Sequence, residues 1–317
     1  MDAVEVKDVS NDPSNSVTGA PFGAGPGVEE RWMDFDGARM RYLQAGSGPA
    51  LILLHGLMGY SFSWRYTMPA LAPYATVYAP DLLGAGFSDR PRNIDHSVRG
   101  TALRVIEFAG RLGLRSFDLL GTSRGGIVAT AVAAECFDSS DLKPGLKPSL
   151  KPSVQRLILV CPVNPYSAHG RWLAPFFGSR LGAAVFRSVV LRKPSLYPFF
   201  HARLFAERSK IPPGSLEGYQ APLAKPGLFE HALSIAQTWT ADLREQEKLL
   251  PKLADIPTLL MWGTEDPAVY FSSMRPLAKN FRNLQTAVFP GVGHLPYEEC
   301  PEEFNQALIR FLTTQES

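Results

Sequence analysis

The sequence has few cysteines and no concentration of charge. Cys136, Cys161 and Cys300 are far apart, and no two of them form a C-x-x-C pair. This spacing argues against a zinc or dithiol redox site and predicts reduced, mostly buried thiols, as in cytoplasmic proteins. The 32 basic residues nearly balance the 30 acidic ones. We therefore do not expect nucleic acid as a partner.

Long apolar runs and targeting signals are also missing. No run of about 18 apolar residues is present, so we expect no membrane span. The first residues, MDAVEVKDVSNDPSNS, carry acids where a signal peptide carries bases, and no apolar stretch follows them. These features favour a cytoplasmic location. The apolar content is nevertheless 45% in 317 residues, enough to bury a large core.

Residues 1–29 are polar or small and are expected to be mobile. They end in GAPFGAGPG, which is not a dinucleotide-binding motif, because no strand precedes the glycines and Val28 stands where the third glycine belongs. A strand–turn–strand pattern follows, WMDF and ARMRYLQAG joined by Asp36 and Gly37.

From residue 50 onward, short apolar runs such as ALILL, ATVYAP, SFDLL and VQRLILV alternate with helical stretches. This alternation predicts a parallel sheet covered on both faces. An aromatic-rich helical stretch interrupts it after LILVCPVNP. We expect an α/β core over residues 30–164 and 246–317, with a helical cap over 165–245. The repeat LKPGLKPSLKPS at 142–153 is interpreted as a surface loop; partner docking is the alternative.

The sequence LLGTSRGGIV, residues 119–128, places Ser123 in a G-x-S-x-G pattern between an expected strand and an expected helix. A strained turn at this position lifts a serine hydroxyl out of the sheet as a nucleophile. Gly121 and Gly125 suit the turn, since a side chain at either position would clash. The alternative is a glycine-rich turn in which the serine only caps the helix.

A serine nucleophile needs a base and a group that orients the base. His294 follows the strand-like TAVFPGVG and precedes a helix, so it lies at the sheet edge where parallel strands end. Asp266 follows the strand-like PTLLMWG, with Glu265 as the alternative acid. The order Ser123, Asp266, His294 is that of a nucleophile-elbow hydrolase.

The reaction also needs two donors for an oxyanion. The backbone N–H of Arg124 begins the helix after Ser123, and the loop HGLMG at 55–59 supplies Leu57 as the second donor. We expect His55 to brace this loop by hydrogen bonds rather than to transfer protons.

Five motifs together resemble the α/β-hydrolase superfamily: HGLMG at 55–59, DLLGAGFSDRP at 81–91, GTSRGG at 121–126, GTEDPAV at 263–269 and GVGHLPYEECPEEF at 291–304. The resemblance implies a mostly parallel eight-stranded sheet flanked by helices, a helical cap and hydrolysis without a cofactor or metal. It also implies a triad of Ser123, Asp266 and His294, with Leu57 and Arg124 as oxyanion donors.

The motifs bear on the type of hydrolase as well. Epoxide hydrolases and haloalkane dehalogenases resemble the cap and the C-terminal motif, but those classes use an aspartate nucleophile, which Ser123 argues against. Hydrolases of C–C bonds share the serine but usually have tryptophan after the histidine, where this chain has Leu295. Cofactor-free haloperoxidases share the triad and are not separated from esterases.

Arg124 follows the nucleophile at a position where fluoroacetate dehalogenases use arginine to hold a substrate carboxylate. One hypothesis is that its guanidinium binds an acidic group of the substrate. The alternative is that it pairs with a nearby acid and only its N–H acts. Ile127, where those dehalogenases have a second arginine, weakens the analogy.

We expect a serine hydrolase that cleaves carboxylic esters or lactones with an apolar acyl or aryl group. The alternatives are a C–C bond hydrolase of diketone or dienoate substrates and a hydrolase-fold ligand receptor without turnover. The only expected partner is a small-molecule substrate, and the protein is expected to be a monomer or a homodimer. The expected substrate-binding residues are Arg124, Trp64, Phe176, Phe177 and Tyr197.

Overall fold

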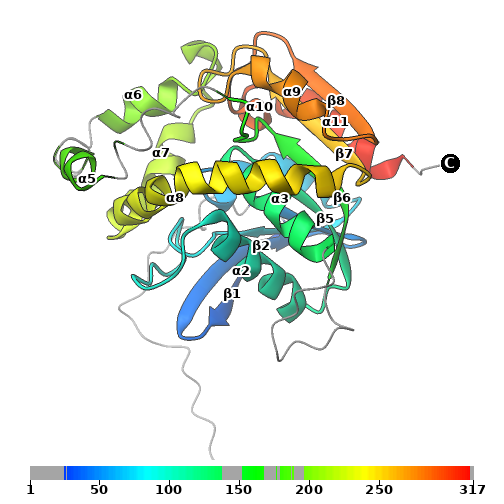
Figure 1. Ribbon diagram of the computed structural model, residues 1–317. Coiled ribbons are helices and arrows are strands. Elements are labelled where there is room, and N and C mark those ends of the chain that lie inside the picture. Colours follow the sequence, from blue (N-terminus) through cyan, green and yellow to red (C-terminus); the bar gives the residue numbers. More distant parts are fainter. Residues whose placement is uncertain are drawn as a thin grey trace, which may run out of the picture.

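Figure 1 shows the computed structural model of the chain, which describes residues 25, 27–137, 152–167, 176, 179–186, 188 and 196–314. The expectations for residues 1–24, for most of the LKP repeat and for Phe177 fall outside the described residues. The strands are β1 (Val28–Phe35), β2 (Ala38–Ala45), β3 (Ala50–Leu54), β4 (Thr76–Pro80), β5 (Ser116–Thr122), β6 (Ser153–Val160), β7 (Thr258–Gly263) and β8 (Leu284–Phe289).

These strands form one eight-stranded sheet in the order β1-β2-β4-β3-β5-β6-β7-β8. The β1–β2 and β2–β4 pairs are antiparallel, and all later pairs are parallel. Asp36 and Gly37 form the β1–β2 turn with φ of 51° and 88°, conformations that glycine and aspartate tolerate best. The predicted α/β fold with a mostly parallel eight-stranded sheet is confirmed.

Helices flank this sheet. Those of the core are α1 (Thr67–Leu71), α2 (Val98–Arg111), α3 (Arg124–Phe137), α9 (Met274–Ala278), α10 (Pro296–Glu299) and α11 (Pro301–Thr313). Short 3₁₀ turns are η2 (Ser61–Trp64), η8 (Leu250–Leu253) and η9 (Phe271–Ser273). Helix α3 packs on β5 and β6 and against α2, while α1 packs against α11. Strands β3, β5 and β7 are almost entirely buried between these helices, and so is the second half of β6.

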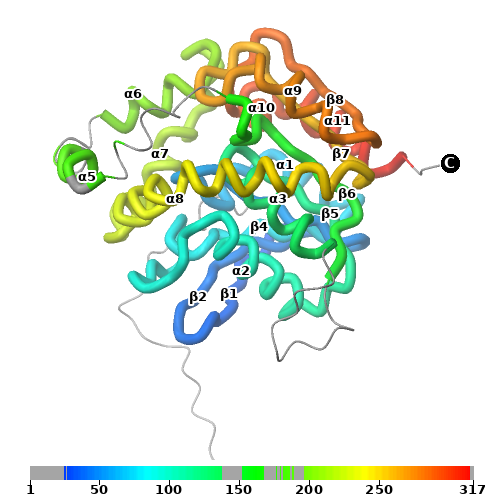
Figure 2. Tube along the Cα trace, viewed as in Figure 1, coloured from blue at the N-terminus to red at the C-terminus, as the bar shows by residue number. Residues whose placement is uncertain are grey.

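A helical insertion lies between β6 and β7. It contains α5 (Arg180–Phe186), α6 (Tyr197–Ala202), η6 (Arg208–Lys210), α7 (Ser215–Gln220), η7 (Ala221–Ala224) and α8 (Leu228–Leu249). In Figures 1 and 2, α5, α6 and α7 lie beside the sheet, and the long helix α8 leads back to the core. Helix α8 continues to Leu249, so it crosses the boundary expected at residue 245.

The parallel strands direct their carboxyl ends to one edge of the sheet. Strands β3, β5, β6 and β7 end there at Leu54, Thr122, Val160 and Gly263, and the loops that follow them hold the candidate functional residues. Among the described residues, no helix has both the length and the apolar character to cross a membrane.

Candidate active site

Ser123 lies in the turn between β5 and α3 and has a φ of 52°. Residues other than glycine rarely adopt this left-handed conformation, because it strains the backbone. Three hydrogen bonds hold the turn: Ser123 N–H donates to the Val160 carbonyl at 2.9 Å, and its own carbonyl accepts from Gly126 and Val163 at 3.0 Å. The strain is therefore maintained by the neighbouring elements of the core.

Close backbone packing surrounds this turn. A Cβ atom on Gly121 would lie 2.2 Å from the Gly125 carbonyl oxygen, and one on Gly125 would lie 2.4 Å from that of Leu54. Only glycine fits at these two positions. A Cβ atom on Gly56 would lie 3.1 Å from the Cβ of Ser123, so the loop after β3 packs directly against Ser123.

Asp266 and His294 form a buried pair beside this turn. The Nδ1–H of His294 donates to Oδ2 of Asp266 at 2.8 Å, and the two side chains are 6% and 0% exposed. The other carboxylate oxygen, Oδ1, accepts from the backbone N–H groups of Ala268 and Val269, each at 2.8 Å. Asp266 thus has a fixed orientation, and its bond to Nδ1 leaves Nε2 as the free nitrogen of the His294 ring.

The loop that carries His294 is anchored to the insertion. The His294 N–H donates to the Leu204 carbonyl at 2.7 Å. The Glu299 carboxylate accepts from the backbone N–H groups of Gly293 and Ala206, and Lys210 Nζ donates to the Gly291 carbonyl at 2.6 Å. The position of the histidine therefore depends on residues from two separate parts of the chain.

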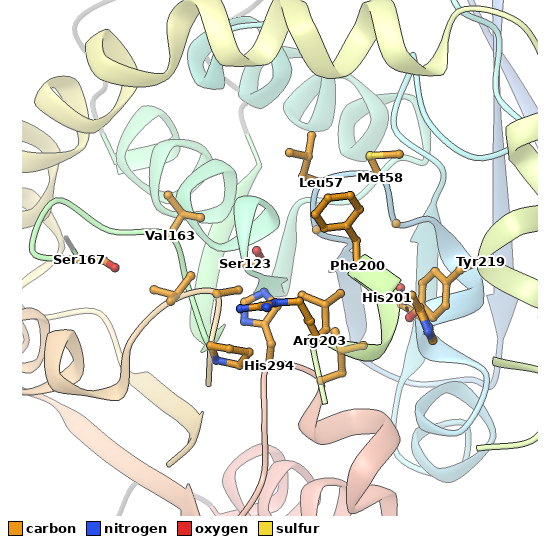
Figure 3. Close-up of a pocket in the computed structure, with 18 of the residues that line it drawn as sticks. Leu57, Met58, Ser123, Val163, Ser167, Phe200, His201, Arg203, Tyr219 and His294 are labelled. Carbon is orange, nitrogen blue, oxygen red and sulfur yellow. Dashed lines mark hydrogen bonds between the residues drawn. The ribbon is translucent and has the colours of Figure 1, made fainter. Parts of the chain in front are cut away.

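Ser123 and His294 line one cavity of about 650 Å³, as Figure 3 shows. Its walls come from the loop after β3, the β5–α3 turn, the loop after β7 and the insertion. Most lining side chains are apolar, and they include Leu57, Val163, Phe199, Phe200, Leu204, Trp239, Leu243, Val269 and Leu295. A cavity of this size and character suits a small, largely apolar ligand.

Leu57 lines the same cavity on the loop after β3. His55 holds this loop as expected: its Nδ1–H donates to the Gly56 carbonyl at 2.8 Å, and its Nε2 accepts from the Leu82 N–H at 3.0 Å. Burial lowers the pKa of His55, so the ring is neutral and rigid. The Arg124 N–H is in the first turn of α3, where backbone donors lack intrahelical acceptors.

The Arg124 side chain does not line this cavity. It is 4% exposed, and its Nη2 donates to the His96 carbonyl at 2.8 Å. Burial lowers the pKa of its guanidinium to about 10, and the charge of Asp242 partly offsets that effect. The structure thus directs this charge toward α2 and α8, away from Ser123, and the geometry does not support the hypothesis of a substrate carboxylate bound by Arg124.

The aromatic residues expected in the pocket have different positions. Tyr197 lines the cavity. Trp64 does not: it is fully buried in the core, with its ring centroid 4.9 Å from that of Tyr297, because the η2 turn directs the adjacent Ser63 to the cavity instead. Phe176 is 41% exposed and is not a cavity-lining residue.

Cys161 lies beside the Asp266–His294 pair, a position that was not expected from the sequence. It follows β6 with a φ of 43°, and its sulfur lies within 4.8 Å of ligand atoms of both Asp266 and His294. Burial and the Asp266 charge raise the pKa of the thiol well above its usual range. The protonated thiol is neither a nucleophile nor a metal ligand. Both Asp266 oxygens are already hydrogen-bonded, so the trio fits a metal poorly.

A polar cluster that the sequence analysis missed joins the insertion to α10. It consists of Arg65, His201, Ser215, Tyr219 and Glu298, and we call it the Glu298 cluster. Arg65 binds the Glu298 carboxylate through two nitrogens at 2.6 and 2.9 Å, while Ser215 and Tyr219 each donate a hydroxyl to it at 2.7 Å. These positions are far apart in the sequence, so no local motif indicated that they meet.

Comparisons with known proteins identify the family of the chain. The family model described as "Alpha/beta hydrolase family" matches residues 51–307, which is most of the chain. A strained serine turn, a buried aspartate–histidine pair and a cavity at the carboxyl edge of a parallel sheet define the general class of α/β hydrolases. The chain belongs to the alpha/beta hydrolase family, and we classify it as an enzyme of that family.

Individual relatives differ in activity. The chain is 27% identical over 294 residues to haloalkane dehalogenase 2 of Mycobacterium tuberculosis, covering 89% of this chain and 94% of the relative. It is 27% identical over 288 residues to a soluble epoxide hydrolase of a Corynebacterium species, covering 87% and 94%. Among solved structures, a meta-cleavage product hydrolase of Pseudomonas fluorescens has a TM-score of 0.69 and 25% identity, covering 87% and 94%.

Proposed function

We propose that this protein is a serine hydrolase that cleaves carboxylic esters or lactones through an acyl-enzyme. The observation that carries the proposal is the strained turn at Ser123, which lines the same cavity as His294, the partner of the buried Asp266. Dehalogenases and epoxide hydrolases, as classes, use an aspartate nucleophile. A serine at that position favours acyl transfer over the activities for which the two curated relatives are named.

In the proposed mechanism, Nε2 of His294 takes the proton of the Ser123 hydroxyl as the oxygen attacks the ester carbonyl. Asp266 holds the imidazole by its bond to Nδ1 and stabilises the imidazolium that forms. The backbone N–H groups of Leu57 and Arg124 donate to the oxyanion. His294 then protonates the leaving alcohol, and water releases the acid by the same steps in reverse.

The cavity supports an apolar acyl or aryl group. Phe199, Phe200, Leu204 and Tyr197 line it from the insertion, which we propose acts as a cap over the site. Burial of such a group removes apolar surface from water and favours binding by roughly 25 cal/mol per Å². Polar substrates such as sugars would leave most of their hydroxyl groups unpaired in this cavity.

The test is a panel of p-nitrophenyl esters of increasing acyl length, assayed with the native protein and with Ser123→Ala. We expect steady turnover by the native protein and a loss of about a thousandfold or more in kcat for Ser123→Ala. Ser167→Ala is a matched control, because Ser167 is a serine of the same cavity, and we expect it to keep most of the activity. Equal rates for the native protein and Ser123→Ala would refute the proposal.

Cleavage of a C–C bond is the second candidate. The similarity to the meta-cleavage product hydrolase favours it, and the same serine and histidine suit a carbonyl next to the broken bond. Leu295, where such hydrolases usually have tryptophan, argues against it. Ser123-dependent turnover of a meta-cleavage dienoate at a higher kcat/KM than any ester would favour this alternative.

A further inference from the structure

The Glu298 cluster reaches the cavity through two of its members, His201 and Tyr219. Figure 3 shows these two side chains together on one side of the cavity, with Ser123 nearer its centre. His201 lies in the last turn of α6 and is 5% exposed. It is a polar ring in a wall that is otherwise formed mainly by apolar and aromatic side chains.

The hydrogen bonds of the cluster define which nitrogen of His201 carries the proton. Ser215 donates its hydroxyl proton to Oε2 of Glu298 at 2.7 Å, and Glu298 is a carboxylate held by Arg65. A hydroxyl has one proton, so Ser215 Oγ acts only as an acceptor toward Nε2 of His201, 3.3 Å away. His201 therefore carries its proton on Nε2.

The second nitrogen of the ring, Nδ1, is then an unprotonated acceptor. Burial lowers the pKa of His201, which keeps the ring neutral at physiological pH. Among the residues that the structure describes, none donates to Nδ1, and Nδ1 is not one of the fully buried atoms that lack a partner. This atom therefore keeps some accessible surface, and His201 is one of the residues that line the cavity.

An acceptor in a largely apolar wall distinguishes ligands by one group. A ligand hydroxyl placed against Nδ1 keeps a hydrogen bond that it would otherwise lose on leaving water. A ligand with a methyl group there leaves Nδ1 unpaired. We propose that Nδ1 of His201 accepts a hydrogen bond from a hydroxyl group on the substrate, so that this site prefers hydroxyl-bearing esters.

This inference rests on the proposed ester hydrolysis and adds a substrate class to it. The substrate would be an ester whose apolar acyl chain or ring carries a hydroxyl group at the end that reaches α6 and α7. His201 is a specificity residue in this scheme. The proton transfer stays with His294.

The experiment compares the p-nitrophenyl esters of hexanoic, octanoic and decanoic acid with their ω-hydroxy counterparts. For each length we measure the ratio of kcat/KM for the hydroxylated ester to that for the plain ester. For at least one of the three chain lengths, we expect this ratio to be roughly 5- to 100-fold higher in the native protein than in His201→Phe. His201→Gln, which keeps an acceptor oxygen, should recover part of the difference.

Tyr197→Phe is the matched control. Tyr197 lies on the same helix, its ring is 6.3 Å from that of His201, and it also lines the cavity. Removing its hydroxyl leaves Nδ1 in place, so we expect the native ratio. The inference is overturned if native protein and His201→Phe have the same ratio at every chain length.

A binding measurement separates this inference from the proposed function. The Ser123→Ala protein, with and without His201→Phe, is titrated by calorimetry with octanol and decanol and with the corresponding α,ω-diols. We expect His201→Phe to weaken diol binding by about fivefold or more relative to the alcohols. Equal weakening of both ligands overturns the inference. Failure of all Ser123-dependent ester turnover would instead refute the proposed function, and the titration would still decide the role of His201.

Discussion

At the scale of single residues, the strained backbone conformation is found at Ser123, the proposed nucleophile. A serine at a φ of 52° costs about 1–2 kcal/mol relative to an ordinary conformation. Hydrogen bonds from Ser123 to Val160 and from Val163 to Ser123 hold it there. The side chain of the next residue, Arg124, has a structural role. Its guanidinium donates a hydrogen bond to the His96 carbonyl.

Arg124→Met tests this position. Because the guanidinium is directed away from the cavity, we expect kcat/KM to change by the same factor, within about threefold, on a neutral ester and on a carboxylate-bearing ester. Arg203→Met is the control, since Arg203 is an exposed arginine that does line the cavity. A selective loss on the carboxylate ester in Arg124→Met would restore the carboxylate-binding hypothesis.

At the scale of elements, the insertion is joined to the core by buried polar contacts rather than by apolar packing alone. Glu298 on α10 receives hydrogen bonds from Ser215 and Tyr219 on α7, and its ion pair with Arg65 leaves the two side chains 0% and 13% exposed. The His294 N–H donates to the Leu204 carbonyl, and the Glu299 carboxylate accepts from the N–H groups of both Gly293 and Ala206. These bonds therefore hold the insertion and the loop of the candidate base in a fixed relative position.

Glu298→Gln tests this connection. Removing the carboxylate leaves the Arg65 charge buried without its partner, which costs about 3–5 kcal/mol in free energy of unfolding for pairs of this kind. Urea unfolding followed by fluorescence measures the change. The control is Asp255→Asn, which breaks the exposed ion pair with Arg282 and should change stability little. Similar small losses in both variants would show that the Glu298 cluster does not hold the insertion on the core.

At the scale of the whole molecule, several histidines are buried in a neutral form. Burial lowers the pKa of His55, of His201, and, well below its usual range, of His231. His96, whose Nδ1 is 2.9 Å from that of His231, has its pKa lowered to about 4, again mainly by burial. The unfolded chain would bind protons at these sites near pH 6.5.

The sign of the resulting pH dependence follows from linkage. Between about pH 6.5 and pH 4 the unfolded state binds more protons at these histidines than the folded state, so they make stability fall as the pH falls. Asp242 and Glu299 act in the opposite direction, because burial raises the pKa of both carboxyl groups. We expect the histidines to dominate, since they are more numerous.

Urea unfolding at pH 7.5 and at pH 5 measures this effect in the native protein and in His96→Gln. Removing one titrating histidine should reduce the loss of stability between these two pH values by about 1–2 kcal/mol. His96 is partly exposed, and contact with solvent weakens the effect of burial, so the lower end of that range allows for this exposure. An unchanged pH dependence in His96→Gln would mean that the His96 ring takes up its proton over the same pH range in the folded and in the unfolded protein.

Much of the fold follows from patterns within short segments. The Asp36–Gly37 turn, the apolar strands and the helices between them were predicted because hydrophobic periodicity and turn residues act locally. The rule that parallel strands end at one edge then led to Ser123, Asp266 and His294 as a group. The structure brings the last two into contact at 2.8 Å and opens Ser123 and His294 to one cavity.

Side-chain direction and long-range polar contacts were beyond the sequence. Trp64 was expected at the cavity, but the geometry of one 3₁₀ turn directs it into the core and gives the cavity Ser63. The Arg124 guanidinium turned toward His96 for a similar reason. The sequence by itself determined the order of the strands and of the candidate catalytic residues that follow them. Only the packing of the insertion on α10 decided that His201, Tyr219 and Glu298 share one site, because their contacts join segments that no local pattern relates.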